Sequence, residues 1–208
     1  MYETSTETLF LGRQDSMQRQ TLLGLAGTTP SKVLEVACGT GRFGTFLRDN
    51  HPQAEYTAVD LSPFYLQKAR DNDAYWVSRQ PGPNKPAPAK FVQAAAEALP
   101  FEDGAFDAVV NVYLFHEMPA KARREAVQEM VRVLAPGGTL SWTDSFQRGD
   151  RPALDESMGN FEALNEPHYV DYIQTDVGAL FEEAGLKPQG KWMSSTSKTL
   201  SFTKPLSS

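Results

Sequence analysis

The sequence predicts an α/β protein whose core is a doubly wound, mostly parallel sheet of seven strands with helices on both faces. Short apolar runs typical of strands alternate with segments of helical spacing from residue 32 to residue 185. Two further apolar runs close the chain, near enough in sequence to form an antiparallel hairpin. A glycine-rich stretch, Val33–Gly44, joins the first apolar run to the next helix, as in Rossmann-like sheets.

The strands are predicted from apolar runs bounded by turn-forming residues, at 32–37, 55–60, 90–93, 106–112, 139–145, 191–195 and 198–203. Helices are predicted within 8–26 and over 42–49, 63–79, 120–134 and 169–185. Ser62 and Pro63 form an N-cap and first-turn pair for the helix at 63–79. Pro136-Gly137-Gly138 ends the helix at 120–134. Four prolines within residues 81–88 predict an irregular surface loop.

The length and composition predict one domain over residues 1–208. A chain of 208 residues with 40% hydrophobic content is long enough to bury a sizeable core. Residues 1–29 form an N-terminal helical segment in this prediction, and residues 147–169 form a polar, irregular insertion with a short helix inside it. No internal repeat and no second domain are expected.

Charge and cysteine content exclude several classes of protein. The net charge of −6 gives no electrostatic support for binding a nucleic-acid backbone, so no nucleic-acid partner is expected. The single cysteine, Cys38, excludes an intramolecular disulfide. No apolar run reaches the roughly 18–20 residues of a membrane span, and the first residues lack the pattern of a signal peptide. We expect a cytoplasmic protein, or one in an organelle matrix if a targeting segment has been removed.

The glycine loop predicts a cofactor pocket that two cofactor classes can claim. Gly39, Gly41 and Gly44 satisfy the dinucleotide fingerprint, in which a pyrophosphate lies at a helix N-terminus. Glu35, just before the loop, would repel a pyrophosphate but suits the ammonium and sulfonium of S-adenosylmethionine. Asp60, at the end of the second strand, fits either class because it can accept from both ribose hydroxyls.

At this point the sequence resembles the class I S-adenosylmethionine-dependent methyltransferases. Glu35-Val-Ala-Cys-Gly-Thr-Gly41 matches the first motif of that family, and Ala58-Val-Asp60-Leu-Ser62 matches the second. The segments at 94–107 and 132–139 resemble those that surround the third, fourth and fifth strands, in the family's order and spacing. The whole is most similar to the small-molecule branch that includes quinone-ring C-methyltransferases.

The resemblance implies S-adenosyl-L-methionine as cofactor, S-adenosyl-L-homocysteine as product and a small-molecule acceptor. Aromatic residues in the candidate acceptor regions, such as Tyr113 and Tyr169, suit an acceptor that is aromatic or apolar. The resemblance also implies which residues bind the cofactor. The loop from Ala37 to Gly41, which includes Cys38 and Gly39, would line the methionine part with support from Glu35. Asp60 would hold the ribose. The remaining implied contacts are Leu61 packing on adenine, Ala95, Ala96 and Glu97 at the adenine edge, and Asn111 beside the methionine moiety. The family often has an aspartate at the position of Ala95.

Candidate groups for acceptor chemistry follow the fourth strand and lie in the insertion. His116 is the candidate proton acceptor, since its ordinary pKa is near 6.5, and Tyr113 could orient a substrate. A helix-capping or pocket-lining role for His116 is the alternative. His168 and Tyr169 could close the acceptor pocket, although they also fit a plain helix entry. No metal ligand set and no oligomeric state are predicted.

Two other functions stay open on the sequence. A nicotinamide-dependent oxidoreductase would use the three glycines but gives no reason for Glu35. A non-catalytic S-adenosylmethionine-binding protein would keep the pocket without turnover.

Overall fold

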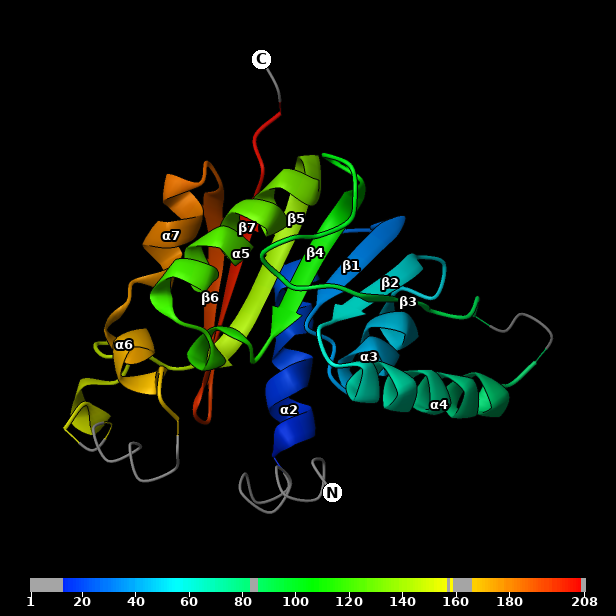
Figure 1. Ribbon diagram of the computed structural model, residues 1–208, viewed down its shortest axis with the longest axis horizontal. Coiled ribbons are helices and arrows are strands. Elements are labelled where there is room, and N and C mark those ends of the chain that lie inside the picture. Colours follow the sequence, from blue (N-terminus) through cyan, green and yellow to red (C-terminus); the bar gives the residue numbers. More distant parts are fainter. Residues whose placement is uncertain (1–12, 83–85, 157, 159–165, 207–208) are drawn as a thin grey trace.

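The computed structural model describes residues 13–82, 86–156, 158 and 166–206. Their strands form one seven-stranded sheet in the order β3-β2-β1-β4-β5-β7-β6 (Figure 1). The strands are β1 Lys32–Val36, β2 Glu55–Asp60, β3 Lys90–Gln93, β4 Phe106–Val112, β5 Leu134–Ser145, β6 Lys187–Ser194 and β7 Ser197–Thr203. The predicted fold class, including the C-terminal hairpin, is confirmed.

The helices alternate with these strands along the chain. The α-helices are α2 Gln14–Arg19, α3 Arg42–Asn50, α4 Pro63–Arg79, α5 Ala120–Val133, α6 Tyr169–Gln174 and α7 Val177–Glu183. Short 3₁₀ helices in the described residues include η1 Gln20–Leu25, η2 Phe115–Glu117 and η3 Pro152–Leu154. The Ser62 side chain accepts from the Tyr65 N–H at the start of α4, as its N-cap position predicted.

The parallel strands end at one edge of the sheet. β1 pairs in parallel with β2 and β4, β2 with β3, and β4 with β5. Only the last two pairings, β5 with β7 and β7 with β6, are antiparallel among the described strands. The loops that follow β1, β2, β4 and β5 therefore share an edge, and ligands of doubly wound sheets bind beyond this edge.

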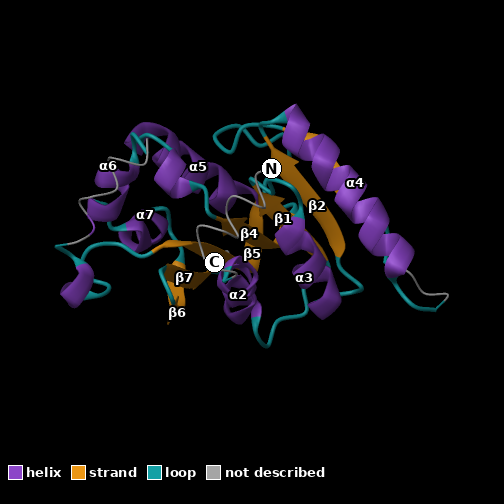
Figure 2. Cartoon of the chain, turned by 90° about the horizontal axis from the view of Figure 1, so that it is seen from below, coloured by secondary structure: helices purple, strands orange, loops and turns teal. Residues whose placement is uncertain are grey.

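Two layers of helices bury the sheet (Figure 2). On one face α5, α6 and α7 cover apolar side chains of β1, β4 and β5, including Leu34, Val109 and Trp142. On the other face η1, α3 and α4 cover a second apolar cluster that includes Val33 and Val110. Alternate residues of one strand thus belong to different clusters, as the period of two along a β-strand requires.

β5 begins five residues earlier than the predicted start at residue 139, because Leu134 already pairs with Phe106 of β4. The irregularity between Phe106 and Ala108 absorbs the change in register. Gly137 adopts a φ of +77°, and its N–H donates to the Lys204 carbonyl beyond β7. α5 therefore ends at Val133, before the Pro-Gly-Gly run, and that run lies inside β5 and not in a separate loop.

The single helix predicted over 169–185 is wrong, because the segment forms two helices, α6 and α7. Thr175 ends α6, and the Asp176 side chain accepts from the Ala179 N–H to cap α7. The apolar spacing continues across the break, so the periodicity alone concealed it. Asp176 was the available signal, since aspartate is a preferred N-cap residue.

Of the predicted N-terminal segment, Gln14–Leu25 forms α2 and η1, and residues 1–12 lie outside the described part of the chain. η1 lies against β5 and β7. The Ser201 hydroxyl donates to the Gly24 carbonyl at 2.9 Å, and the Ser141 hydroxyl donates to the Thr21 carbonyl at 2.7 Å. A side chain at Gly24 would place its Cβ 2.2 Å from the Ser141 hydroxyl oxygen, so this approach requires glycine.

Candidate functional site

The glycine loop follows β1 at the carboxyl edge of the sheet and turns into α3. Ala37, Gly39 and Gly41 all have positive φ, at 59°, 53° and 76°. The N–H groups of Cys38, Gly39 and Gly41 all donate within the protein, to the Val59 carbonyl, the Asp60 carboxylate and the Cys38 carbonyl, so these bonds fix the shape of the turn. A Cβ added at Gly39 would meet nothing within 4 Å, so the loop leaves open space at that point.

Asp60 ties the end of β2 to this loop. Its Oδ2 accepts from the Gly39 N–H at 2.8 Å, and its Oδ1 accepts from the Ser62 N–H at 2.9 Å. The carboxylate is largely buried, and each oxygen keeps a further lone pair for a ligand. Asp60 therefore holds the glycine loop against the end of β2.

Glu35 lies beneath the loop and is only 1% exposed. Its Oε2 accepts a hydrogen bond from the Tyr56 hydroxyl of β2. Burial raises the pKa of Glu35 to about 8. The carboxyl is thus mainly protonated at neutral pH in the protein without ligand, and any positive charge bound nearby would favour its ionised form.

Gly44 of α3 leaves the space that the hydrogen-bonded pair of Glu35 and Tyr56 occupies. A Cβ at Gly44 would lie 2.3 Å from the Tyr56 hydroxyl oxygen. The third glycine of the motif is therefore needed for packing α3 over the Glu35–Tyr56 pair. Cys38 is also buried in this region, and desolvation raises the pKa of its thiol well above the ordinary value, so it is no activated nucleophile.

Asn111 ends β4 beside the loop. Its Nδ2 donates to the Val36 carbonyl at 2.8 Å, and the side chain is 1% exposed. Its Oδ1 has no partner among the described residues. A buried amide oxygen without a donor is costly, so this atom is a natural acceptor for a ligand ammonium or hydroxyl group.

The predicted adenine contacts lie on the β2 side of the same edge. Leu61 is 67% exposed, unusually open for a leucine next to a buried strand end. The Gln93 amide donates to the Leu61 carbonyl at 3.0 Å and fixes this turn against β3. Ala95, Ala96 and Glu97 form a turn directly after β3, with Ala96 buried and its two neighbours partly exposed.

His116 occupies η2, directly beyond β4. Its Nδ1 lies 2.6 Å from Oδ1 of Asp144, which is 0% exposed. The other oxygen of Asp144 accepts from the backbone N–H groups of Phe115 and His116. Burial alone would lower the pKa of His116, but the charge and hydrogen bond of Asp144, with smaller contributions from Glu117 and Glu166, raise it to about 9.

Three tyrosine rings surround His116. The ring centroids of Tyr113, Tyr169 and Tyr172 lie 6.2, 6.4 and 6.2 Å from the imidazole. Tyr113 has a positive φ of 56°, and its hydroxyl is hydrogen-bonded to Ser197 at the start of β7. The structure thus brings the predicted residues Tyr113, His116 and Tyr169 together. His168 precedes α6 and is partly exposed, with no side-chain capping bond to that helix.

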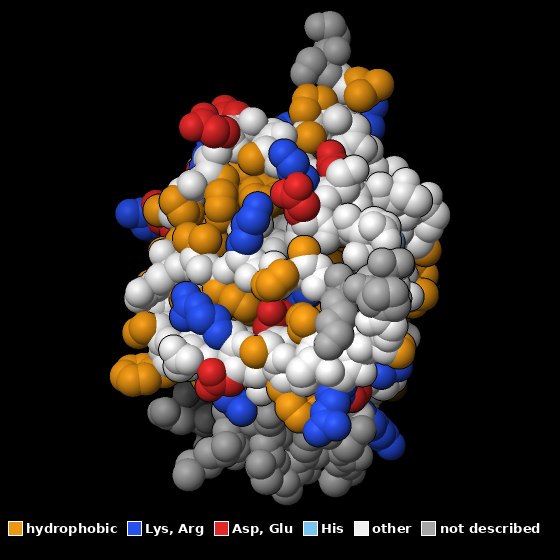
Figure 3. Space-filling model, turned by 90° about the vertical axis from the view of Figure 1, so that its right-hand side faces the viewer, with side chains coloured by type: hydrophobic (Ala, Val, Ile, Leu, Met, Phe, Trp, Pro, Cys, Tyr) orange, Lys and Arg blue, Asp and Glu red, His pale blue; other side chains and the backbone are white. Residues whose placement is uncertain are grey.

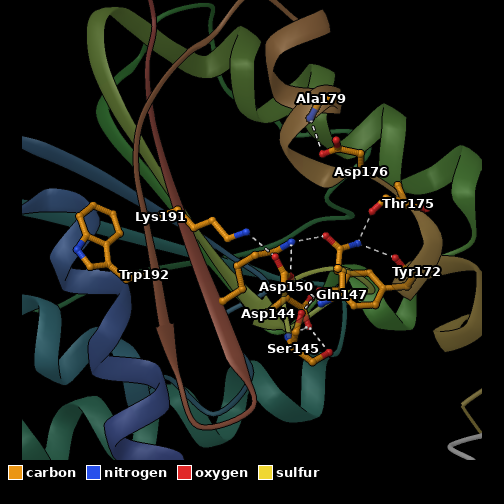
Figure 4. A network of polar contacts seen from close by, with 12 residues as sticks. Asp144, Ser145, Gln147, Asp150, Tyr172, Thr175, Asp176, Ala179, Lys191 and Trp192 are labelled. Carbon is orange, nitrogen blue, oxygen red and sulfur yellow. Dashed lines mark hydrogen bonds and ion pairs between the residues drawn. The ribbon is translucent and has the colours of Figure 1, made fainter. Parts of the chain in front are cut away.

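A buried polar network holds α6 in place (Figure 4). The Gln147 amide donates to the carbonyls of Tyr172 and Thr175, and its Oε1 accepts from Lys198 at 2.7 Å. The Lys198 ammonium is also 2.8 Å from Asp150. The start of the 147–169 insertion is therefore anchored between the C-terminal hairpin and α6. Residues 157 and 159–165 of the insertion lie outside the described part of the chain.

Ligand atoms of His116, Glu117 and Glu166 lie within 4.8 Å of one another, a spacing that a metal ion could span. His116 Nε2 is 3.6 Å from Glu117 Oε1. Because the pKa of His116 is raised to about 9, the imidazole itself carries a positive charge between these carboxylates at neutral pH. An ion-pair cluster accounts for this grouping without a metal.

Sequence reasoning missed Asp144 and Arg123. Asp144 lies near the end of an apolar strand, where only its charge distinguished it. Arg123 lies on α5 and is 0% exposed, with hydrogen bonds to η2 and α6. An arginine in an amphipathic helix ordinarily points to solvent, so no local pattern indicated its burial.

A hollow of about 510 Å³ lies away from this edge, between α4 and β3, on the side of the molecule seen in Figure 3. Arg70, Val77 and Phe91 are among the residues that line it. None of the predicted site residues contributes to it.

A family model described as "Methyltransferase domain" matches residues 33–138, which include the glycine loop, Asp60, Asn111 and His116. The chain belongs to the class I S-adenosylmethionine-dependent methyltransferases. The expected cofactor, S-adenosylmethionine, is that of the family.

Relatives of this methyltransferase support the assignment. An uncharacterized methyltransferase of Synechocystis sp. is 31% identical over 181 residues, which cover 86% of this chain and 77% of that protein. Demethylmenaquinone methyltransferase of Thermus thermophilus is 35% identical over 111 residues, which cover 53% of this chain and 46% of that enzyme. The match therefore spans less than half of the Thermus enzyme.

Solved structures share the fold of this methyltransferase. An O-methyltransferase family protein from Burkholderia thailandensis has a TM-score of 0.72 at 20% identity, covering 95% of this chain and 58% of that one. The N-methyltransferase NodS from Bradyrhizobium japonicum, in complex with S-adenosyl-L-homocysteine, has a TM-score of 0.67 at 18% identity, covering 92% and 87%. Within the described residues, no helix is both long and apolar enough to span a membrane.

Proposed function

We propose that this chain transfers the methyl group of S-adenosylmethionine to a small aromatic or apolar acceptor. The observation that carries the proposal is the alignment of Gly39, Asp60 and Asn111 along the carboxyl edge, with an open backbone, a carboxylate and an unpaired amide oxygen. Bound there, the cofactor supplies an activated methyl group on a sulfonium, so positioning and exclusion of water provide much of the rate.

The residues present fit this cofactor. Asp60 keeps lone pairs for the two ribose hydroxyls, and Asn111 Oδ1 offers an acceptor to the ammonium of the methionine part. Exposed Leu61 offers an apolar surface to adenine, with the turn at Ala95–Glu97 along its edge. The Glu35 carboxyl is bonded to Tyr56 and is nearly inaccessible, so in this proposal it influences the bound cofactor through its charge and not through direct contact.

His116 is the group proposed to take a proton from the acceptor where the acceptor has one to lose. Asp144 holds Nδ1, so Nε2 is the nitrogen left for the acceptor side. With a pKa of about 9, His116 accepts a proton readily once it is itself deprotonated. Tyr113 and Tyr169, on either side of His116, provide aromatic surface for a planar acceptor.

Charge narrows the class of acceptor. Glu117 and Glu166 lie beside His116, and Asp144 lies behind it. A free carboxylate on the acceptor would be repelled by this group, whereas a hydroxyl, an amine or a ring carbon would not. Among relatives, demethylmenaquinone methyltransferase carries a quinone-type name and another is named fatty-acid O-methyltransferase. We propose a neutral ring compound over a fatty acid.

Isothermal titration with S-adenosyl-L-homocysteine tests the cofactor assignment. We expect binding by the whole chain and a loss of at least about tenfold in affinity for Asp60→Ala, the equivalent of about 1.4 kcal/mol. Asp107→Ala is a matched control, because Asp107 also accepts from two backbone N–H groups, those of Ser31 and Lys32, but at the opposite edge of the sheet.

Two further measurements, a titration with a nicotinamide cofactor and a methylation assay, distinguish the methyltransferase from the oxidoreductase and from the non-catalytic binding protein. Binding of a nicotinamide cofactor but not of S-adenosyl-L-homocysteine would support an oxidoreductase and refute the proposal. Binding without methylation of any compound in a panel of quinones, phenols and amines would indicate a non-catalytic binding protein.

A further inference from the structure

The acceptor side of the site is built from two segments that are distant in sequence, and Arg123 lies between them. The first segment is η2, which carries His116, and the second is α6, which carries Tyr169 and Tyr172. Arg123 lies four residues before Val127 on the apolar face of α5, and it is 0% exposed.

The guanidinium of Arg123 donates hydrogen bonds to backbone carbonyls at both ends of η2. Its Nε donates to the Phe115 carbonyl at 3.2 Å, and its Nη2 donates to the Met118 carbonyl at 2.9 Å. These carbonyls flank His116 and Glu117. The backbone around His116 is thus fixed by two donors of one rigid, planar group.

The same guanidinium holds α6. Its Nη1 is 3.0 Å from Asp171 Oδ2 and 2.8 Å from the Thr175 hydroxyl oxygen. The centroid of the Tyr172 ring, between these two residues in sequence, is 5.6 Å from the Arg123 Cζ. The Asp171 carboxylate is largely exposed, so its ion pair with Arg123 is weakened by solvent. The buried guanidinium of Arg123 is therefore stabilised as much by its carbonyl and hydroxyl acceptors as by Asp171.

From these contacts we propose that Arg123 is a positioning residue, which sets the orientation of His116 against the tyrosines of α6 and so the shape of the acceptor side. It touches neither the cofactor loop nor any predicted cofactor-binding residue among its described contacts. The inference rests on the proposed function for its catalytic meaning, but the orientation of His116 can be measured without turnover.

A lysine at position 123 could not make the same set of hydrogen bonds as Arg123. The acceptors lie on η2 and on α6, and the planar fork of arginine reaches both sets through Nε, Nη1 and Nη2. A lysine ammonium has three donors at a single point, so it keeps the charge but loses the simultaneous bridge. Arg123→Lys and Arg123→Met should therefore have similar effects on His116.

The experiment is a pH titration of the histidine resonances by NMR on the whole chain, which has three histidines. The charged groups that act on His116 are Asp144 of β5, Glu117 of η2 and Glu166 before α6. In the native chain we expect a pKa of about 9, and in both Arg123 variants a fall of at least about one unit, as the imidazole leaves Asp144. Affinity for S-adenosyl-L-homocysteine should stay within about threefold, because the cofactor half is untouched.

Arg124→Met is the matched control. Arg124 is the next residue of α5, it is 61% exposed, and its Nη1 lies 3.6 Å from Glu183. It should leave the titration of His116 unchanged. An unchanged His116 titration in folded Arg123→Met would overturn the proposal, and so would an equal shift in Arg124→Met.

If Arg123→Met does not fold, a second pair of variants tests the same proposal. Asp171→Asn and Thr175→Val retain the guanidinium and weaken only its hold on α6. Together they should lower the pKa of His116 and weaken the nuclear Overhauser contacts between His116 and Tyr172, and no change in either would overturn the proposal. Failure of the native chain to bind S-adenosyl-L-homocysteine would instead refute the proposed function and leave the His116 measurement intact.

Discussion

The imidazole Nδ1 of His116 lies 2.6 Å from Oδ1 of Asp144, a carboxylate with no exposed surface. Asp144 is itself fixed by backbone N–H groups of Phe115, His116 and Ser145. A carboxylate held by three backbone donors has a fixed position and orients the imidazole ring, which leaves Nε2 as the nitrogen not bonded to Asp144. η2, which follows β4, and β5 thus contribute jointly to the His116–Asp144 pair.

Asp144→Asn should lower the pKa of His116 from about 9 to its ordinary 6.5 or below. Burial lowers this pKa, and the substitution removes the negative charge of Asp144 that raises it. The measurement is the NMR titration of the imidazole. Glu117→Gln serves as control, since Glu117 is exposed and lies 3.6 Å from Nε2, and its effect should be smaller. A larger shift from Glu117→Gln than from Asp144→Asn would contradict this view of the pair.

A base of pKa about 9 predicts the pH dependence of turnover with a hydroxyl acceptor. The reactive form of His116 is unprotonated, so the rate should rise with pH up to about 9 and then level off. In Asp144→Asn the rise should end at lower pH. A rate independent of pH between about 6 and 9 would exclude His116 as the base.

Stability should fall as pH rises through the neutral range. The pKa of Glu35 is raised from 4.5 to about 8, so its neutral form favours the folded state and that contribution is lost as pH rises through about 8. For His116 the stabilising contribution is complete below about 6.5 and is lost as pH rises through about 9. Urea unfolding of the native chain and of Glu35→Gln checks the Glu35 part, because glutamine keeps an acceptor for Tyr56 but does not titrate. Equal pH slopes for the two proteins would contradict it.

Gly44→Ala should destabilise the chain by about 1–3 kcal/mol, because the new Cβ would lie 2.3 Å from the Tyr56 hydroxyl oxygen. Adding Tyr56→Phe removes that oxygen and should recover part of the loss. Thermal unfolding of the single and double variants measures the coupling. If the double variant simply adds the two single effects, the contact does not explain why glycine is needed here.

Lys198→Met should cost more stability than Lys191→Met, although both lysines bind Asp150. The side chains of Lys198 and Asp150 are only 8% and 5% exposed, so removing Lys198 leaves the buried carboxylate with Lys191 alone as counter-charge, at a cost of about 3 kcal/mol. Lys191 is half-exposed, and its pair should be worth about 1 kcal/mol or less. Chemical denaturation of both variants tests the difference, and equal costs would show that burial does not decide it.

The cofactor side could be predicted from sequence because its determinants are local. Gly39 and Gly41 form a turn next to one strand, and Asp60 ends the next strand, so their spacing places them at one edge. The structure joins Gly39 to Asp60 through a direct hydrogen bond, as that placement suggests. Which cofactor atoms these residues contact stays a prediction.

The acceptor side could not be predicted in the same way, because its key contacts join distant segments. Asp144 acquires its role from His116, 28 residues earlier in the chain. Arg123 acquires its role from Asp171 and Thr175, 48 and 52 residues later. Such pairs leave no periodic signal, and the break between α6 and α7 depends on a capping side chain that the apolar spacing obscured.

The contact between η1 and the last strand has a consequence for biosynthesis. The Gly24 carbonyl accepts from Ser201, which lies 177 residues further along the chain. During translation η1 can contact β5, through the bond between Thr21 and Ser141, before β7 has been made, so its packing is completed only when the last strand is added. Domains of this kind complete folding only after such long-range contacts form. The newly made chain therefore carries η1 only partly covered until β7 is synthesised, which makes this segment an expected point of chaperone contact or early proteolysis.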